Sequence, residues 1–282
     1  MRLLRVGELG AERPAVERDD RWFDARPVTD DFDGAFLAGG GIGRLRAALD
    51  AGRLPEMSHE ALRIGAPVAR PGKVVCIGLN YRDHAAETGA AVPEEPVVFM
   101  KDPSTVIGPH DDVLVPRGST KTDWEVELGV VIGSTARYLE DTDAARDVVA
   151  GYLVSHDVSE REWQLERGGT WDKGKSCETF NPTGPYLVPA EDVGDPQQLG
   201  LRLWVNGVRR QNGSTADMIF PVLEVLRYVS QFMVLNPGDL VNTGTPAGVA
   251  LALPGTPYLR PGDAVELEID GLGRQRQVMR QA

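Results

Sequence analysis

The stretch TDWEVELGVVIG, residues 122–133, places two glutamates directly before a run of apolar residues. Side chains alternate between the two faces of a strand, so Glu125 and Glu127 are expected on one face, about 7 Å apart. Residues 128–132 are apolar at consecutive positions, apart from one glycine, which is typical of a strand covered on both faces. We therefore predict a buried strand that two carboxylates enter together.

Two carboxylates in such a place would be costly without partners. A divalent cation would remove that cost, because hard ions such as Mg²⁺ bind carboxylate oxygens. The alternative is a strand end that is not yet buried, and the pair alone does not decide between them. Asp157 ends another apolar run, and it would supply a third oxygen only if the two strands are neighbours; otherwise it is a turn residue.

The same spacing recurs as AVELEIDG, residues 264–271. Here apolar residues alternate with Glu266 and Glu268, and Asp270-Gly271 offers a tight hairpin turn. We predict that these two glutamates form the solvated face of an ordinary hairpin strand.

Composition excludes several classes of function. The 282 residues include 42 acidic and 30 basic side chains, for a net charge of −12. Nucleic acids and anionic membrane surfaces are therefore poor partners. The two cysteines indicate neither a disulfide framework nor a zinc site. The N-terminus does not resemble a signal peptide, and no apolar run reaches membrane-spanning length. We expect a soluble, cytoplasmic protein.

The chain divides near residue 70. Residues 1–70 indicate a small N-terminal α+β domain with a helix over 42–52, and a Pro-containing linker over 65–73 follows it. Residues 71–282 are rich in short β-like runs with Gly, Pro and Asp between them. A helix is predicted from Pro221 to Met233. The expected fold class is mainly β with some α.

A second group of polar residues follows the predicted strand at 73–77. His84 and Glu87 are three residues apart and would share one face of a helical turn. An imidazole held by a carboxylate is a competent general base, although an exposed first helical turn would look the same. Lys175 lies in a glycine-rich stretch, 168–185, that suggests close approach to a ligand. The loop NTGTPAGV, 242–249, can present N–H groups and hydroxyls to an anion.

Six motifs occur in order over about residues 72–280: IGLNYRDHAAE, PVVFMK, DWEVELGVVIG, SHDVSEREWQ, KGKSCETFNPTGP and NTGTPAGV. As a set they resemble the fumarylacetoacetate hydrolase family. The resemblance implies a rolled, mixed β-sandwich that is mostly antiparallel, with a smaller N-terminal domain, and a homodimer. Within the family, the chain is similar to bacterial 2,4-diketo-3-deoxy-sugar-acid hydrolases and to ureidoglycolate lyase.

The resemblance also implies roles for ten residues. The family's metal ligands, for Mg²⁺ or Mn²⁺, match Glu125, Glu127 and Asp157. Its catalytic residues match His84, Glu87 and Lys175. Polar residues that line the pocket in relatives match Lys101, Arg161, Gln164 and Thr245. The segment SEREWQ, which carries Arg161 and Gln164, departs from the ARDxQ form of some members.

The implied function is metal-dependent cleavage of a C–C bond in a small 2,4-dioxo acid of the acylpyruvate type, which yields pyruvate and a carboxylic acid. The substrate would be a small 2-oxo acid, and a 2,4-diketo-3-deoxy sugar acid belongs to that class. Alternatives with the same residues are oxaloacetate decarboxylase, 2-hydroxyhepta-2,4-diene-1,7-dioate isomerase and ureidoglycolate lyase. The His84–Glu87 pair favours hydrolysis, because hydrolysis needs an activated water. A non-catalytic protein that binds oxo acids is the remaining hypothesis.

Overall fold

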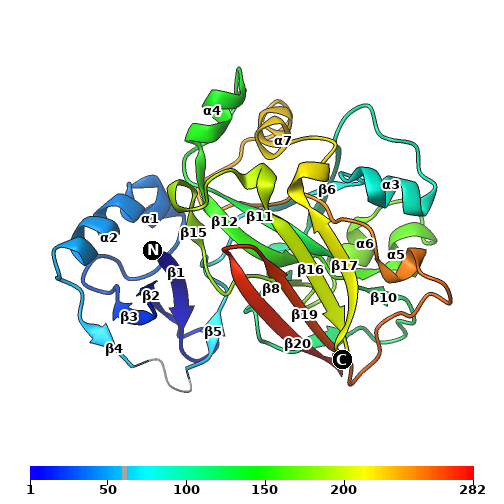
Figure 1. Ribbon diagram of the computed structural model, residues 1–282, viewed down its shortest axis with the longest axis horizontal. Helices are drawn as coiled ribbons and strands as arrows, with labels where there is room; N and C mark the ends of the chain where they lie inside the picture. The colour runs from blue at the N-terminus through cyan, green and yellow to red at the C-terminus, as the bar shows by residue number, and fades with distance from the viewer. Residues whose placement is uncertain (59–61) are drawn as a thin grey trace.

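The N-terminal part of the chain forms a sheet of its own (Figure 1). The computed structural model describes residues 1–58 and 62–282. The sheet has the order β4-β3-β2-β1-β5, formed by β1 Arg2–Val6, β2 Arg13–Arg18, β3 Arg21–Asp24, β4 Glu56–Met57 and β5 Ile64–Gly65. Two helices accompany it, α1 Gly34–Ala38 and α2 Gly41–Asp50. The helix predicted over 42–52 is thus confirmed as α2.

A six-stranded sheet forms the centre of the molecule. Its order is β15-β12-β11-β18-β6-β7, formed by β6 Val74–Gly78, β7 Val97–Lys101, β11 Val126–Ile132, β12 Val149–His156, β15 Val188–Pro189 and β18 Leu240–Asn242. All neighbouring strands are antiparallel except β18 and β6, which run parallel. β11 therefore lies inside the sheet, paired with β12 on one side and β18 on the other.

A five-stranded sheet packs on the central one. Its order is β17-β16-β19-β20-β9, formed by β9 Val113–Val115, β16 Gly200–Val205, β17 Val208–Ser214, β19 Ala264–Ile269 and β20 Gly273–Gln281. Burial alternates along β16 and β19, as it does in a strand with one face in a core. Leu203 and Leu267 from this sheet share a core with Leu128 and Val130 from β11. The two sheets thus form a sandwich.

β11 is buried at every residue, which confirms the prediction of a strand covered on both faces. Its even-numbered residues, Leu128 and Val130 among them, belong to the core between the two sheets. Val131 points to the opposite face and joins the core of the N-terminal unit, with Leu3 and Leu45. Glu127 shares this second face with Val131, four residues away, so the glutamates lie where the N-terminal unit no longer provides the cover.

Short elements complete the larger part. They are α3 Arg82–Thr88, α4 Thr142–Asp147, α5 Arg161–Leu165, α6 Asp172–Lys175 and α7 Val222–Val229, together with the strand pairs β8 Val106–Ile107 with β14 Asn181–Pro182 and β10 Thr122–Asp123 with β13 Ser159–Glu160. The helix predicted over 221–233 is confirmed as α7 but ends four residues earlier. Helices of four to seven residues are too short to leave a clear sequence period.

The mainly β fold with some α that the sequence predicts is confirmed. The boundary expected near residue 70 falls between β5 and β6. Within the described ranges, none of the helices combines the length and the apolar character needed to cross a membrane.

Gly151, in β12, offers a test of the tight contact between β12 and β15. A Cβ atom at this position would lie 2.2 Å from the carbonyl oxygen of Val188. We predict that Gly151→Ala separates the two strands and lowers the free energy of unfolding by about 1–3 kcal/mol, as measured by urea denaturation. Gly43→Ala is the control, because no atom lies within 4 Å of a Cβ there; it should stabilise α2 by about 0.5–1 kcal/mol. Equal stabilities of the two variants would contradict this account.

Candidate active site

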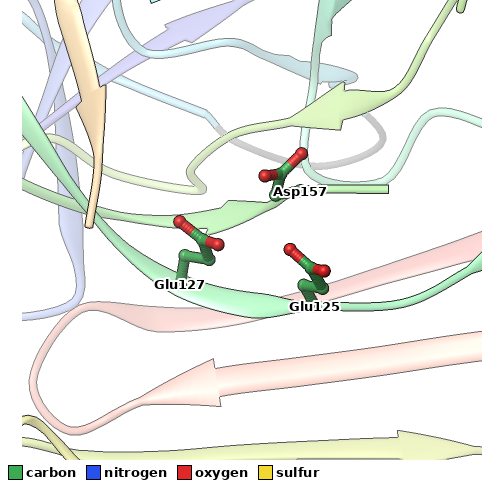
Figure 2. A group of neighbouring side chains, drawn as sticks. All are labelled: Glu125, Glu127 and Asp157. Carbon is green, nitrogen blue, oxygen red and sulfur yellow. The ribbon is translucent and has the colours of Figure 1, made fainter. Parts of the chain in front are cut away.

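Three carboxylates meet at the ends of two neighbouring strands, as Figure 2 shows. Glu125 directly precedes β11, Glu127 lies within it, and Asp157 directly follows β12. The register pairs Val126 with His156, and the Asp157 amide donates to the Glu125 carbonyl oxygen over 3.0 Å. The three residues are at most 5% exposed, and each offers an oxygen within 4.8 Å of the others. The strands are therefore neighbours, as a role for Asp157 requires.

Three buried cations contact these carboxylates. Lys175 Nζ lies 2.8 Å from both Glu125 Oε2 and Asp157 Oδ2. Arg161 Nη2 lies 2.6 Å from Glu125 Oε1. Lys101 Nζ donates to Asp157 Oδ1 from the other side. Because Lys175 bridges two members of the triad, an ammonium group lies between carboxylates that are also suited to a metal ion.

Burial and neighbouring charges act in opposite directions on Glu125. Burial favours its neutral form, but the charges of Lys175 and Arg161 outweigh burial and hold the pKa of Glu125 well below its usual range. Burial likewise disfavours the Lys175 ammonium, yet Asp157 and Glu125 raise the pKa of Lys175 above its usual value. Glu125 and Lys175 are therefore both charged at neutral pH.

Glu127 is in a different position, because no cationic side chain of residues 1–58 and 62–282 pairs with it. Its Oε2 accepts a hydrogen bond from the Gly244 amide over 2.8 Å. Burial, together with the charges of Asp157 and Glu125, raises the pKa of Glu127 well above its usual range. A buried carboxylate without a counterion is costly. Glu127 thus favours either a proton or a further cation.

The charge balance fits a divalent ion. Four buried carboxylates face three buried cations, namely Asp123, Glu125, Glu127 and Asp157 against Lys101, Arg161 and Lys175. One negative charge is left over when all of them are ionised. The ligand atoms that the cluster offers are carboxylate oxygens, which hard ions such as Mg²⁺ and Mn²⁺ prefer. An ion of charge two would turn the excess into a single positive charge, and that charge suits an anionic ligand.

His84 and Glu87 form the predicted pair on α3. His84 Nδ1 lies 2.7 Å from Glu87 Oε1. The second oxygen of Glu87 accepts the Gly248 amide over 2.8 Å, which fixes the carboxylate. Gly89 ends α3 in the left-handed conformation, with φ of 67°. Because the carboxylate accepts from Nδ1–H, the ring keeps Nε2 free to take a proton.

A cavity of about 280 Å³ brings most of the predicted residues together. Its polar lining consists of His84, Thr88, Glu125, Glu127, Arg161, Gln164, Lys175 and Thr245. Arg161 donates through Nη1 to Gln164 Oε1 over 3.0 Å, so the two side chains are placed as a unit. The candidate base and two of the three candidate metal ligands, Glu125 and Glu127, therefore face one space, whereas Asp157 is not part of the lining.

Two of the residues expected to bind substrate have other partners. Lys101 is 1% exposed and is not part of the cavity lining; it holds Asp157 and the Val158 carbonyl oxygen. Thr245 lines the cavity, but its hydroxyl donates to the Val126 carbonyl oxygen and accepts from Gln211. In the loop that was expected to present N–H groups to an anion, the Gly244 and Gly248 amides bind carboxylates of the protein itself.

Sequence reasoning missed Asp123 and Gln211. Asp123 is fully buried. Its carboxylate accepts a hydrogen bond from Arg161 Nε over 2.8 Å and further hydrogen bonds from the main-chain amides of Ala250 and Leu251. A signal was present, since Asp123 stands two residues before Glu125 and continues its alternation. Gln211 in β17 joins the Val126 amide to Thr245. It stands in the polar run VRRQNGS, where nothing distinguishes it.

The second glutamate pair follows the prediction made for it. Glu266 and Glu268 lie on β19, with side chains 28% exposed. Arg274 pairs with Glu266 over 2.7 Å, and Arg202 pairs with Glu268 over 3.3 Å. They form the solvated face of a hairpin strand and take no part in the cavity.

The chain is similar to known proteins over its whole length. A family model for the C-terminal part of fumarylacetoacetate (FAA) hydrolase matches residues 73–280. A Burkholderia multivorans protein that is provisionally named a hydrolase is 52% identical over 286 residues, covering 100% of both chains. The solved fumarylacetoacetate hydrolase of psychrophilic Exiguobacterium antarcticum is 33% identical, with a TM-score of 0.87 and 100% of both chains covered.

Two further solved structures differ from each other in the reaction that their names give. Maleylpyruvate hydrolase of Sphingobium sp. SYK-6, in complex with manganese(II) and pyruvate, is 28% identical, with a TM-score of 0.81 and 100% of both chains covered. The 2-hydroxyhepta-2,4-diene-1,7-dioate isomerase of Mycobacterium marinum is 28% identical, with a TM-score of 0.77, covering 100% of this chain and 98% of that one. Similar folds at this level thus serve both hydrolases and isomerases.

Glu127→Gln separates metal binding from folding. The amide can still accept from Gly244, and it removes a buried carboxyl group that has no counterion. We predict unchanged or slightly higher stability without metal, and affinity for Mn²⁺ lower by about 100-fold or more, because one of three anionic ligands is lost. Calorimetric titration and thermal unfolding measure both. Glu266→Gln is the matched control and should keep full Mn²⁺ affinity. Full affinity in Glu127→Gln would remove the residue from the metal site.

Proposed function

The chain belongs to the fumarylacetoacetate hydrolase family, and we propose that it is a Mg²⁺-dependent hydrolase of acylpyruvate-type 2,4-dioxo acids. It would add water across the C3–C4 bond and release pyruvate and a carboxylic acid. The 2,4-diketo-3-deoxy sugar acids belong to the same chemical class. The observation that carries the proposal is that His84, hydrogen-bonded to Glu87, lines the same cavity as the carboxylates of Glu125 and Glu127.

His84 acts as the general base. Glu87 holds the proton of Nδ1, so Nε2 accepts a proton from a water molecule as that water attacks C4. Glu87 then stabilises the imidazolium, and the Gly248 amide keeps Glu87 in place. In this scheme the base activates water, whereas the three carboxylates hold the metal ion.

Arg161, Gln164 and Lys175 bind the anionic part of the substrate. Arg161 Nη2 lies 2.6 Å from Glu125 Oε1. Gln164 Oε1 accepts from Arg161 Nη1, so within the described residues the Gln164 amide nitrogen remains for a ligand. These donors suit the C1 carboxylate. Lys175 stabilises the oxyanion that forms on C4 or donates a proton to it.

Bond breaking completes the reaction. The C3–C4 electron pair stays on C3 as the enolate of pyruvate, C4 leaves as a carboxylic acid, and the proton taken by His84 returns to C3. A divalent ion, when bound at Glu125, Glu127 and Asp157, supplies Lewis-acid stabilisation of the charge on the C2 oxygen. Water is thus consumed, and no oxidant or other co-reactant is needed.

An isomerase is the second candidate, favoured by the likeness to the Mycobacterium marinum enzyme. Isomerisation, like decarboxylation of oxaloacetate, passes through an enolate without attack by water. Ureidoglycolate lyase is a further use of the same residues. The His84–Glu87 pair favours hydrolysis over these reactions, because only hydrolysis needs a base directed at water. Fold likeness by itself does not select among them.

The direct test is turnover of acylpyruvates, 2,4-diketo-3-deoxy sugar acids, oxaloacetate, ureidoglycolate and 2-hydroxyhepta-2,4-diene-1,7-dioate with Mg²⁺. We expect pyruvate and the matching carboxylic acid in equal amounts, with activity lost on addition of a chelator. Carbon dioxide from oxaloacetate, isomerised diacid or cleaved ureidoglycolate, with every acylpyruvate left intact, would overturn the proposal.

His84→Ala tests the base itself. We predict that kcat falls by about 10²- to 10⁴-fold, while affinity for Mn²⁺ and for pyruvate stays within about twofold, because the ring takes no part in the carboxylate cluster. Stopped-flow assays and calorimetry measure the two effects. His110→Ala is the control, since His110 lies outside the cavity lining and accepts a main-chain amide of Arg276. Undiminished turnover in His84→Ala would assign the base elsewhere.

A further inference from the structure

The group attached to C4 of the substrate has no assigned partner among the polar residues of the cavity. A fumaryl-type tail would need a cation, and a sugar-derived tail would need hydrogen-bonding partners. The rest of the cavity lining is largely apolar and includes Ile77, Leu79, Phe99, Leu165, Trp171 and Leu251. The character of this surface decides which tail can bind.

Phe99 and Trp171 form an aromatic wall beside the catalytic lysine. Their ring centroids are 5.2 Å apart in an edge-to-face arrangement, and Lys175 Nζ lies 5.1 Å from the Phe99 centroid. Trp171 has helical backbone angles and directly precedes α6. Residues four apart in a helix share one face, so Trp171 and Lys175 point to the same side. The wall therefore begins next to the group that would contact C4.

Trp171 packs against Gly78. A Cβ atom at Gly78 would lie 2.4 Å from Trp171 Cζ3, so the ring packs directly on bare backbone at the end of β6. Asp172 fixes the segment, because its Oδ1 accepts the Met100 amide over 3.1 Å. Both Phe99 and Trp171 stay partly exposed, which leaves aromatic surface for a ligand to cover.

Every cation of the lining already has an anionic partner. Lys175 binds Glu125 and Asp157. Arg161 binds Asp123 and Glu125. The single net positive charge that would remain once a divalent ion is bound is matched by one substrate carboxylate. A second carboxylate in the tail would therefore enter without a free counterion among the residues that line the cavity, which is costly.

The hydroxyl groups of the lining are also engaged. Thr245 Oγ1 binds the Val126 carbonyl oxygen and Gln211. Thr88 Oγ1 donates to the His84 carbonyl oxygen over 2.9 Å. Hydroxyls on a substrate tail would lose water there and gain few partners.

We propose that this cavity takes acylpyruvates with an uncharged, apolar acyl tail, which packs against Phe99 and Trp171, and that it selects against tails bearing a carboxylate or several hydroxyls. The inference rests on the proposed function and deepens it. Among the dioxo acids, it favours simple aliphatic or aromatic acyl groups over 2,4-diketo-3-deoxy sugar acids and over fumaryl-type diacids.

Two matched substrate pairs test the wild-type enzyme. The first pair is 7-methyl-2,4-dioxooctanoate and 2,4-dioxoheptanedioate, whose tails end in an isopropyl group or an isosteric carboxylate. We expect kcat/KM to be at least about 100-fold higher for the first. The second pair is 2,4-dioxoheptanoate and its 5,6-dihydroxy derivative, for which we expect about a 10- to 100-fold preference for the compound without hydroxyls. Equal or reversed preferences in both pairs would overturn the inference.

Trp171→Ala tests whether the aromatic wall binds the apolar tail. We expect kcat/KM for 7-methyl-2,4-dioxooctanoate to fall about 10-fold or more, with a much smaller change for 2,4-dioxopentanoate, whose methyl tail is too short to reach far along the rings. Trp171→Phe should restore most of the loss. An equal fall for both substrates would make Trp171 a support for Lys175 and would refute its role in tail selection.

Leu165→Lys tests the charge argument by adding a cation to the cavity lining. Leu165 lines the cavity and is 47% exposed, so a lysine there needs no burial. It should raise kcat/KM for 2,4-dioxoheptanedioate by about 2- to 5-fold, an effect that weakens with salt. Leu9→Lys is the control, because Leu9 is 77% exposed and lies outside this cavity. A gain in the control as large as that in Leu165→Lys would contradict the inference.

Binding of compounds that cannot be cleaved separates the two proposals. The probes are 7-methyl-2-oxooctanoate and 2-oxoheptanedioate, which lack the C4 carbonyl, titrated calorimetrically with Mn²⁺ present. Tighter binding of the first by about 10-fold or more supports the apolar pocket even if no acylpyruvate is cleaved, in which case only the proposed reaction fails. Tighter binding of the diacid overturns the inference, whatever the reaction.

Discussion

Four buried carboxylates face three buried cations at the ends of β11 and β12, and their partners come from several surrounding elements. Isolated charges inside a protein are costly, so each must meet a partner at hydrogen-bonding distance. Lys175 and Arg161 satisfy Glu125, whereas Glu127 is left with only an amide. The cluster therefore has one negative charge more than its side-chain cations neutralise. This excess negative charge suits the cluster to a divalent ion, which would in turn attract an anionic substrate.

The partners come from segments that are far apart in the sequence. Lys101 ends β7, Arg161 begins α5, and Lys175 ends α6. The β11–β12 register fixes Asp157 opposite Glu125. The short helices α5 and α6 then place Arg161 and Lys175 beside these carboxylates. Because the cluster joins strands of one sheet to loops around it, a change in any of these segments would disturb the others.

The sequence predicted the strands that carry the triad, the His84–Glu87 pair, α2 and α7, because each leaves a periodic pattern or a spacing with a chemical meaning. Arg161, Gln164 and Thr245 could be named only through family resemblance. Asp123 and Gln211 were missed, since their roles depend on long-range contacts with Arg161 and Thr245 that no local pattern encodes. The apolar wall was also invisible, because Phe99 and Trp171 meet only after β7 and α6 pack. The homodimer and the cytoplasmic location stay predictions.

Residues 244–251 connect the charge cluster to the base. Amides of this segment bind three separate carboxylates: Gly244 binds Glu127, Gly248 binds Glu87, and Ala250 and Leu251 bind Asp123. A base inside the cluster would lose its affinity for protons beside Lys175 and Arg161, or beside a metal ion. His84 instead lies on α3, where its ring is hydrogen-bonded to a carboxylate of its own, Glu87. The main-chain amides of this one segment therefore position both the carboxylate that holds the base and two carboxylates of the cluster.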